Sequence, residues 1–330
     1  LELREQGMAC ILISHKLGEV MRVSDEVTIL RDGRTIETIV VERSAQGEAS
    51  IDEGRVIRGM VGRDLDERYP ERVGEIGAER FEVRGWTVDH PAQTGRRMVD
   101  GADLSLRSGE IVGMAGLMGA GRTEFAMSLF GRSYGRYVNG ELLRDGKTLS
   151  VDNVTKAINS GIAYVPEDRK SLGLLLDDDI RHNTTLAGLR HISTRGILDQ
   201  GLEEVEARRM SERMRVRSHS TAQTVRTLSG GNQQKVVLGK WMFTRPELLI
   251  LDEPTRGIDV GAKYEIYLIV RRLAAEGTSV LLISSELPEL LGMCDRIYTM
   301  CEGRITGQVP RAEADQETLM KLMTRTGDQP

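Results

Sequence analysis

Short apolar blocks alternate with amphipathic segments along the chain, and this pattern predicts an α/β fold. The apolar run 248–251 is typical of a strand that is buried on both faces of a parallel sheet. The segment 262–277 repeats apolar residues at helical spacing and ends at a glycine, which predicts a helix packed on the core. Its core-facing residues are Ile266, Ile269, Val270, Leu273 and Ala274.

Further helices are predicted at 180–192 and 202–216, within a helical subdomain at about 176–232. In the later segment the apolar residues recur at helical spacing, and charged residues cover the other faces. We therefore expect one side of this helix to face a core. The residues on that side are Leu202, Val205, Met210 and Met214.

An internal repeat relates the two ends of the chain. Residues 7–34 align without gaps on residues 277–304, at a constant offset of 270. Each copy has the pattern of a strand, a short helix, a second strand and a glycine turn. Residues 58–63 are more weakly similar to 321–326, at an offset of 263. The identical positions in the first alignment are Gly7, Leu12, Ile13, Ser14, Leu17, Glu19, Asp25, Gly33 and Arg34.

The repeat suggests a division of the chain. We interpret residues 1–62 as the C-terminal remnant of a first domain, and residues 81–330 as a complete second domain. Residues 63–80 are rich in charge and contain proline and glycine, which is typical of a linker. At the offset of 270, Leu1 corresponds to Arg271, so the part of the first domain that would precede it is missing here. We therefore expect the chain to be a piece of a longer protein.

Composition agrees with a soluble globular protein. The 330 residues are 39% hydrophobic and 29% charged, with a net charge of −5, so a nucleic-acid partner is disfavoured. No apolar stretch approaches the ~18 residues that a membrane-spanning helix needs. Cys10, Cys294 and Cys301 lack metal-ligand spacing, and we expect reduced thiols in or beside core strands of a cytosolic protein.

The sequence GLMGAGRTE (116–124) follows a short apolar strand and precedes a helical pattern. It fits the phosphate-binding loop G-x-x-x-x-G-K-[ST] at every fixed position but one, because arginine replaces lysine. The arginine keeps the positive charge on a broader, planar group, and the next hydroxyl can reach Mg²⁺. Taken alone, the loop is also compatible with a structural turn. The candidate nucleotide-binding residues are Gly116, Gly119, Ala120, Gly121, Arg122, Thr123 and Glu124.

Two further motifs follow in order. The sequence LSGGNQQK (228–235) opens a helix and exposes backbone N–H groups and a hydroxyl to an anion. The sequence LLILDEP (248–254) is an apolar strand that ends in two carboxylates. Asp252 can hold Mg²⁺ through water, and Glu253 can polarise the water that attacks a γ-phosphate. The candidate residues of the first of these motifs are Leu228, Ser229, Gly230, Gly231, Asn232 and Gln233.

This order of motifs resembles the ATP-binding-cassette (ABC) ATPases, in which LSGG is the signature motif, and the resemblance covers nearly the whole chain. With YVPEDRK (164–170) and the tandem arrangement, it looks like the second half of the duplicated ATPase subunit of bacterial sugar importers of the ribose, galactose and xylose class. The resemblance implies a P-loop NTPase fold of ABC type, with a mixed core sheet, flanking helices and a helical subdomain. It also implies ATP and Mg²⁺ as ligands, and ATP hydrolysis.

The same resemblance implies partners and a location. The family's ATPase drives separate transmembrane permease subunits, which a periplasmic sugar-binding protein supplies. The chain is therefore expected at the cytoplasmic face of the inner membrane, as a peripheral subunit. The residues do not specify which sugar is moved.

The resemblance also assigns roles to single positions. Glu167 stands where most cassettes have the Q-loop glutamine, and Asp259 matches the D-loop aspartate. Trp86 lies at about the distance before the loop at which an aromatic ring stacks on adenine. His15 matches the switch histidine of the first cassette, and Ser285 takes that place in the second.

Three of these positions, Arg122, Glu167 and Ser285, depart from the family pattern at one nucleotide site, while the signature is intact. In the family each P-loop faces the signature of the other cassette. We therefore expect residues 228–235 to complete a site that uses His15, and the Arg122 site to bind nucleotide but turn it over slowly. Losing one transition-state contact typically costs on the order of 3 kcal/mol, or about a hundredfold in rate.

For the chain alone we expect weak nucleotide binding and little hydrolysis, unless a first cassette or a second ATPase chain supplies the opposing half-site. Two alternatives stay open. One is a non-transport ABC ATPase of the translation or DNA-repair type, although the basic arms and coiled-coil insertions usual there are absent. The other is a nucleotide-binding regulator without a transport partner.

Overall fold

The structure, a computed structural model, describes residue 3 and residues 6–14, 17–31, 34–42, 53–61 and 69–325. The chain divides into two compact units. The first comprises Leu1–Arg68 and Ile258–Glu265, and the second comprises Tyr69–Gly257 and Ile266–Pro330. None of the helices in the described ranges combines the length and the apolar character needed to cross a lipid bilayer.

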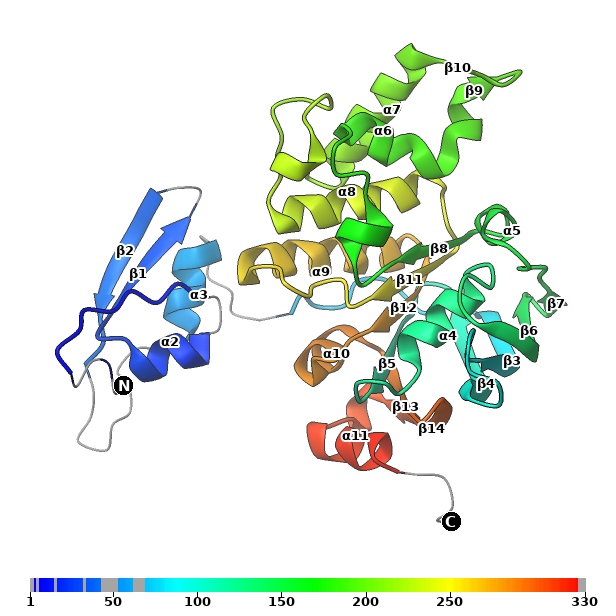
Figure 1. The fold of residues 1–330 in the computed structure, drawn as a ribbon, viewed down its shortest axis with the longest axis horizontal. Helices are drawn as coiled ribbons and strands as arrows, with labels where there is room; N and C mark the ends of the chain where they lie inside the picture. The colour runs from blue at the N-terminus through cyan, green and yellow to red at the C-terminus, as the bar shows by residue number, and fades with distance from the viewer. Residues whose placement is uncertain are drawn as a thin grey trace. The chain divides into compact units, whose positions relative to one another are not determined.

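The first unit is built around a β-hairpin (Figure 1). Strand β1 (Glu26–Arg31) pairs antiparallel with β2 (Arg34–Val40). Helix α2 (Leu17–Val23) precedes the hairpin in the chain, and helix α3 (Glu53–Val61) follows it. A Cβ atom on Gly59 would lie 2.6 Å from Ile29 Cδ1, so glycine permits the close approach of α3 to the hairpin. The small core contains Val20, Val27, Ile29, Ile39, Val41 and Val56.

The short helix and the hairpin of the repeat recur in the second unit. Helix α10 (Leu287–Met293) and strands β13 (Arg296–Cys301) and β14 (Arg304–Pro310) have the bounds of α2, β1 and β2 shifted by 270 residues. Both hairpins change register at the same step, after Ile29 in one and after Thr299 in the other. Helix α11 (Gln316–Met323) begins 263 residues after α3, since 316 − 53 = 263.

One element of the repeat was predicted wrongly. Residues 8–14 form no strand, and Ile11 and Ile13 are each 94% exposed. Their counterpart β12 (Ser279–Ile283) is buried between two parallel neighbours. An apolar run needs neighbouring strands, and the described part of the first unit contains only the β1–β2 pair. Cys10 is therefore exposed rather than in a core, whereas Cys294 is buried.

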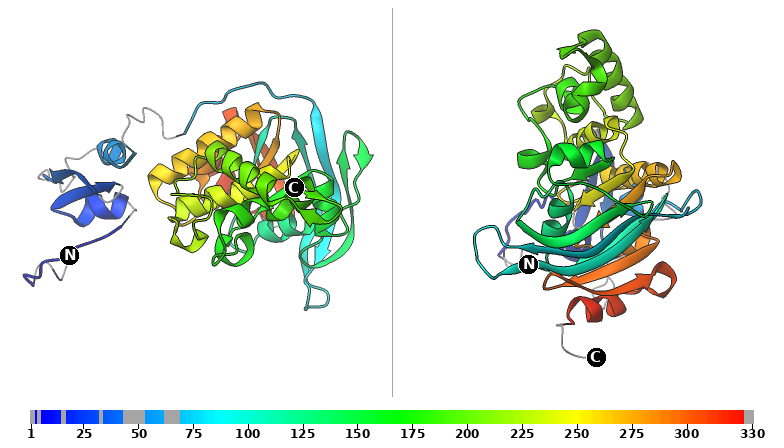
Figure 2. Two further views of the ribbon diagram at one scale, coloured as in Figure 1. Left: turned by 90° about the horizontal axis from the view of Figure 1, so that it is seen from above. Right: turned by 90° about the vertical axis from the view of Figure 1, so that its right-hand side faces the viewer.

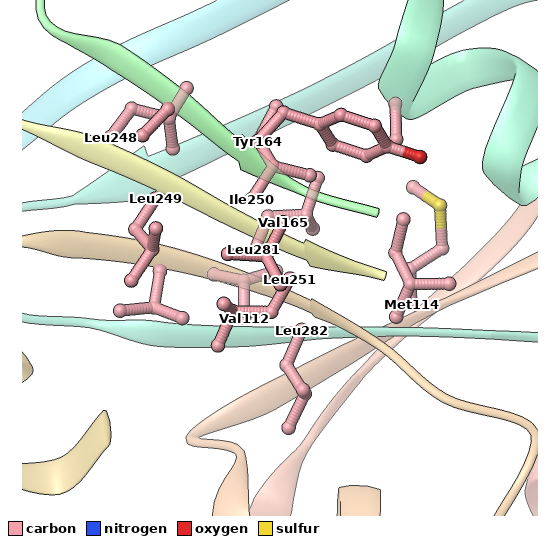
Figure 3. Packing of buried hydrophobic residues seen from close by; sticks show 14 of the residues in the cluster. Val112, Met114, Tyr164, Val165, Leu248, Leu249, Ile250, Leu251, Leu281 and Leu282 are labelled. Atoms are coloured by element: carbon pink, nitrogen blue, oxygen red, sulfur yellow. The ribbon is translucent and has the colours of Figure 1, made fainter. Parts of the chain in front are cut away.

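The second unit contains the predicted mixed sheet, with six strands. Strand β14 is antiparallel to β13, and all the other neighbours in the sheet are parallel. The central strands are buried along their whole length, as their continuous apolar runs predict, and their side chains pack on both faces (Figure 3). In sheet order the strands are β14, β13, β5 (Ile111–Gly116), β12, β11 (Leu248–Asp252) and β8 (Ile162–Val165).

A second, antiparallel sheet with long strands lies along one side of this unit (Figure 2). The helices α6, α7 and α8 contact one another and gather at the end away from α11 (Figures 1 and 2). The antiparallel strands, in sheet order, are β4 (Arg97–Arg107), β3 (Glu79–Asp89), β6 (Arg136–Arg144) and β7 (Lys147–Thr148). The α-helices of the remainder are α4 (Arg122–Leu129), α5 (Val154–Asn159), α6 (Ile180–Thr185), α7 (Gln200–Arg213), α8 (Gly230–Phe243) and α9 (Val260–Ala275). Short elements are η1 (Arg169–Gly173), η2 (Leu186–Ile192), β9 (Ser193–Thr194), β10 (Ile197–Leu198), η3 (Val225–Thr227) and η4 (Arg311–Glu313).

The predicted helix faces are confirmed in part. All five apolar residues predicted on α9 are buried. In the helical subdomain Met210 and Met214 are buried, but Leu202 and Val205 are 40% and 60% exposed, so their assignment to the core was wrong. The buried residues of α7 are Glu203, Ala207, Met210 and Ser211, and Glu203 accepts a hydrogen bond from Thr185 of α6 at 2.8 Å. The covered face of α7 is therefore displaced from the one that carries Leu202 and Val205.

The predicted linker 63–80 is partly integrated into the second unit. The rings of Tyr69 and Tyr267 lie 5.3 Å apart, and Arg72 Nε lies 2.6 Å from Asp295 Oδ1. Arg271 donates to the carbonyl of Pro70 at 3.2 Å. Residues 69–78 therefore pack on the second unit ahead of β3, while residues 62–68 lie outside the described residues.

Lys240 of α8 gives the stability of this unit a pH dependence that can be measured. Its Nζ donates to Gly173 O at 2.5 Å, and burial lowers the pKa to about 8 from 10.5. Between these two values the unfolded chain holds a proton that the folded protein has lost, so the free energy of unfolding rises with pH. The slope is at most about 1.4 kcal/mol per pH unit.

In Lys240→Met this contribution should vanish. Urea unfolding is measured at pH 7 and pH 9.5. The free energy of unfolding of the wild type, relative to that of Lys240→Met, should be larger at pH 9.5 than at pH 7. Lys156→Met, which removes an exposed lysine, is the control and should track the wild type. Parallel pH curves for the wild type and Lys240→Met would contradict the prediction.

Candidate functional site

The carboxyl ends of the parallel strands bring the sequence motifs to one edge of the sheet. Strand β5 ends at Gly116 and leads into the predicted phosphate loop, and β11 ends at Asp252. Ser285 follows β12, and Glu167 follows β8. Because these strands are parallel neighbours, the loops that follow them leave the sheet on the same side.

The loop between β5 and α4 has the backbone of a phosphate cradle. Gly121 precedes the helix with φ +100°, in the left-handed region, and a Cβ there would lie 2.6 Å from Met98 O. Among the described residues, no side chain caps the first turn of α4. The backbone N–H groups of this turn therefore point out of the helix N-terminus without a side-chain acceptor. Glu124 lies in this first turn, and Ala120 of the loop is buried. The arrangement can bind an anion at a helix N-terminus.

Arg122 points from this loop to the carboxylate of Glu253. Its Nη1 donates to Glu253 Oε1 at 3.4 Å, and the side chains of the two residues are only 11% and 9% exposed. Ser285 Oγ donates to the other oxygen, Oε2, at 3.1 Å. Glu253 adopts φ +47°, a backbone that costs a non-glycine residue of order 1 kcal/mol, and this turn directs the side chain to the loop. Burial raises the pKa of Glu253, and Arg122 and Ser285 oppose the shift.

Asp252 is suited to a divalent cation. Its side chain is fully buried, and Tyr164 donates to Oδ2 at 3.0 Å. Oδ1 is buried without a hydrogen-bond partner among the described residues. Burial raises the pKa of Asp252, and the nearby Thr123 and Tyr164 hydroxyls and the Arg122 charge oppose this. An unpaired carboxylate oxygen with a threonine hydroxyl close by fits the oxygen ligands that Mg²⁺ prefers.

The signature residues form the start of α8 in the helical subdomain. Ser229 is the N-cap residue and accepts a hydrogen bond from Asn232 N at 3.5 Å and from Asn232 Nδ2 at 3.1 Å. Leu228 and Gln233 are buried and fix the turn, whereas Ser229 is exposed. The helix therefore presents the Ser229 hydroxyl and the half-buried Gly230 at a surface, whereas Gly231 is buried behind them in the first turn.

The other predicted residues that the structure describes have different partners. Glu167 forms an ion pair with Arg256. Asp259 Oδ1 accepts from Ala262 N at 3.0 Å, at the start of α9. Trp86 is 1% exposed and donates to Ser128 Oγ at 2.9 Å, so its ring lies in the core and adenine stacking stays a prediction. His15 lies outside the described residues.

Two residues at these edges were missed by the sequence reasoning. Tyr164 donates a hydrogen bond to Asp252, and its position as the first residue of YVPE, near the end of a buried strand, was the available signal. Arg169, two residues after Glu167, lies against Gly230 of the signature, and no local pattern indicates that contact.

Comparison with known proteins agrees with this geometry. Residues 99–256 match the family model described as ABC transporter. The phosphate loop, the Asp252–Glu253 strand end and the serine-capped glycine helix thus belong to an ATP-binding cassette of the ABC transporter family.

Similar proteins include several that are named as ATP-binding proteins of sugar transport or import. The chain is 57% identical, over 329 residues, to the L-arabinose transport ATP-binding protein AraG of Geobacillus stearothermophilus, covering 100% of this chain and 63% of that protein. It is 48% identical over 323 residues to the xylose import ATP-binding protein XylG of Geobacillus kaustophilus, covering 98% of this chain and 62% of that protein. It is 42% identical over 322 residues to the ribose import ATP-binding protein RbsA of Bacillus subtilis, with the same coverage. The chain thus spans less than two thirds of these relatives.

Solved structures confirm the fold. The ADP conformation of MJ1267, an ATP-binding cassette of an ABC transporter, matches with a TM-score of 0.62 at 19% identity, over 74% of this chain and 98% of that one. The predicted fold class, an ABC-type cassette with a mixed sheet and helices, is therefore confirmed.

Removing the Thr123 hydroxyl tests the metal site. Thr123→Ala should weaken binding of a fluorescent ATP analogue on the order of tenfold in Mg²⁺, because one oxygen beside Asp252 is lost. In EDTA the same variant should bind as the wild type does. Thr123→Ser keeps the hydroxyl and should behave normally in both conditions. An equal loss with and without Mg²⁺ would show that the hydroxyl acts independently of the metal.

Proposed function

We propose that the chain is part of the ATP-binding and ATP-hydrolysing subunit that energises import of a monosaccharide through a separate membrane permease. The named substrates of the relatives, arabinose, xylose and ribose, support this class of cargo. ATP would be held by the loop 116–124, with Mg²⁺ between Thr123 and Asp252. A periplasmic sugar-binding protein, permease subunits and a position at the cytoplasmic side of the inner membrane follow from the same proposal.

We further propose that the site at Arg122 is slow. The observation that carries this is the buried contact between Arg122 and Glu253, the carboxylate that would polarise the attacking water. An arginine that pairs with the base is not free to serve a phosphate in the same position, and Ser285 occupies the other carboxylate oxygen. A serine in place of the switch histidine also reaches less far towards a γ-phosphate. Each feature opposes hydrolysis without removing the carboxylate.

The intact signature serves the other site in this proposal. Ser229 and the N–H groups at the start of α8 would face nucleotide held by the opposing cassette, which contributes His15. We favour transport over translation or DNA repair because the three relatives described above are all named as transport or import proteins.

Paired substitutions in the complete ATPase subunit, assembled with its permease, test this division of labour. Glu253→Gln should leave most of the ATPase rate, because the slow site carries little of it. Ser229→Ala should lower the rate on the order of a hundredfold, because it removes a contact to the γ-phosphate at the faster site. A collapse to background with Glu253→Gln would contradict the slow-site assignment, and normal turnover with Ser229→Ala would contradict the role of the signature.

The isolated 330-residue chain provides a second test. Because it carries one P-loop and one signature, which belong to different composite sites, we expect weak ATP binding by calorimetry and ATP hydrolysis near background. Robust turnover by the purified chain would contradict the composite arrangement.

A further inference from the structure

Arg169 lies against the signature motif. It belongs to the loop that follows β8, and its Nη1 donates to the carbonyl of Arg256 at 3.1 Å. A Cβ atom built on Gly230 would meet Arg169 Nη2 at 2.8 Å. The guanidinium group therefore occupies the space that a side chain would take at this signature glycine, beside the exposed Ser229.

The positive charge of Arg169 lacks a matching carboxylate. No ion pair within the described ranges includes Arg169, and its Nε is buried without a hydrogen-bond partner there. Burial lowers the pKa of Arg169, and Asp168 only opposes the shift. The Asp168 carboxylate instead accepts the backbone N–H groups of Lys170 and Ser171. A partly desolvated cation without an anion is costly, and such groups concentrate at binding sites.

The loop that carries Arg169 is held at several points. Asp168 caps its first turn, and Lys240 donates to the carbonyl of Gly173 at its end. Arg256, which receives the Arg169 hydrogen bond on its carbonyl, forms an ion pair with Glu167 through its side chain. The guanidinium group is thus placed beside the signature in advance, so that little ordering is needed when an anion arrives.

We propose that Arg169 is a further phosphate-binding residue of the signature edge. Together with the Ser229 hydroxyl and the N–H group of Gly230, it would contact the γ-phosphate of ATP held by the opposing cassette. The signature itself carries no charge, whereas the planar fork of arginine is suited to phosphate oxygens. This inference rests on the proposed function, because it takes the signature edge to face a nucleotide.

Two substitutions separate phosphate binding from support of the loop. In Arg169→Gln the side chain can still donate to the Arg256 carbonyl but carries no charge, and in Arg169→Lys the charge is kept. Lys170→Met removes an exposed positive charge one residue away and is the matched control. Ser229→Ala reports on the signature itself. The steady-state kcat, the KM for ATP and the melting temperature are measured in the complete subunit assembled with its permease.

We expect Arg169→Gln to lower kcat on the order of a hundredfold and to raise KM, with an unchanged melting temperature. Arg169→Lys should lose less than Arg169→Gln, and Lys170→Met should match the wild type. Normal kinetics for Arg169→Gln, or equal losses for the Gln and Lys variants, would overturn the inference. If Ser229→Ala is impaired while Arg169→Gln is normal, the proposed function stands without Arg169. If Ser229→Ala is also normal, the proposed function itself is wrong.

Discussion

The parallel pairing of β8, β11, β12 and β5 is the constraint on which the site depends. Residue Leu248 pairs with Ser279 and Ile162, and Val280 pairs with Ile111, so four strands run in step and end at one edge. Strands in this arrangement must be apolar on both faces, and polar residues can appear only where the strands end. Asp252 is the first buried carboxylate after such a run. A one-residue slip of β11 would turn its side chain to the other face.

The charge balance at this edge follows from burial. Asp252 and Glu253 are adjacent and largely removed from water, which raises the pKa of both carboxylates. Arg122 is the cation that lies against them, and in the structure it contacts Glu253. Phosphate oxygens and a carboxylate compete for the same guanidinium group. A compact lysine ammonium would meet the same competition with less reach across the loop.

Much of this could be predicted from the sequence because it depends on local patterns. The bounds of α2, β1 and β2 recur at an offset of 270, and the Arg122–Glu253 contact places the P-loop beside the end of β11 as the motif order implies. The failures have non-local causes. Residues 8–14 carry a strand pattern without partner strands among the described residues, and the periodicity of α7 does not show which of its faces is covered. Trp86 has the sequence position of a stacking residue, but the antiparallel sheet and Ser128 enclose it.

The segment from Glu253 to Arg256 connects the two anion-facing edges. Arg256 N donates to Glu253 O at 3.1 Å, and the Arg256 carbonyl accepts from Arg169 beside the signature. Under the proposed function, nucleotide in the P-loop must draw Arg122 away from Glu253, because one guanidinium group cannot hold both anions in the same place. Glu253 is the first residue of a tight turn that ends at Arg256, and the Arg256 carbonyl accepts the hydrogen bond from Arg169. If the site is slow, as proposed, its occupancy by nucleotide would change the contacts at one end of this turn while the signature edge lies at the other end.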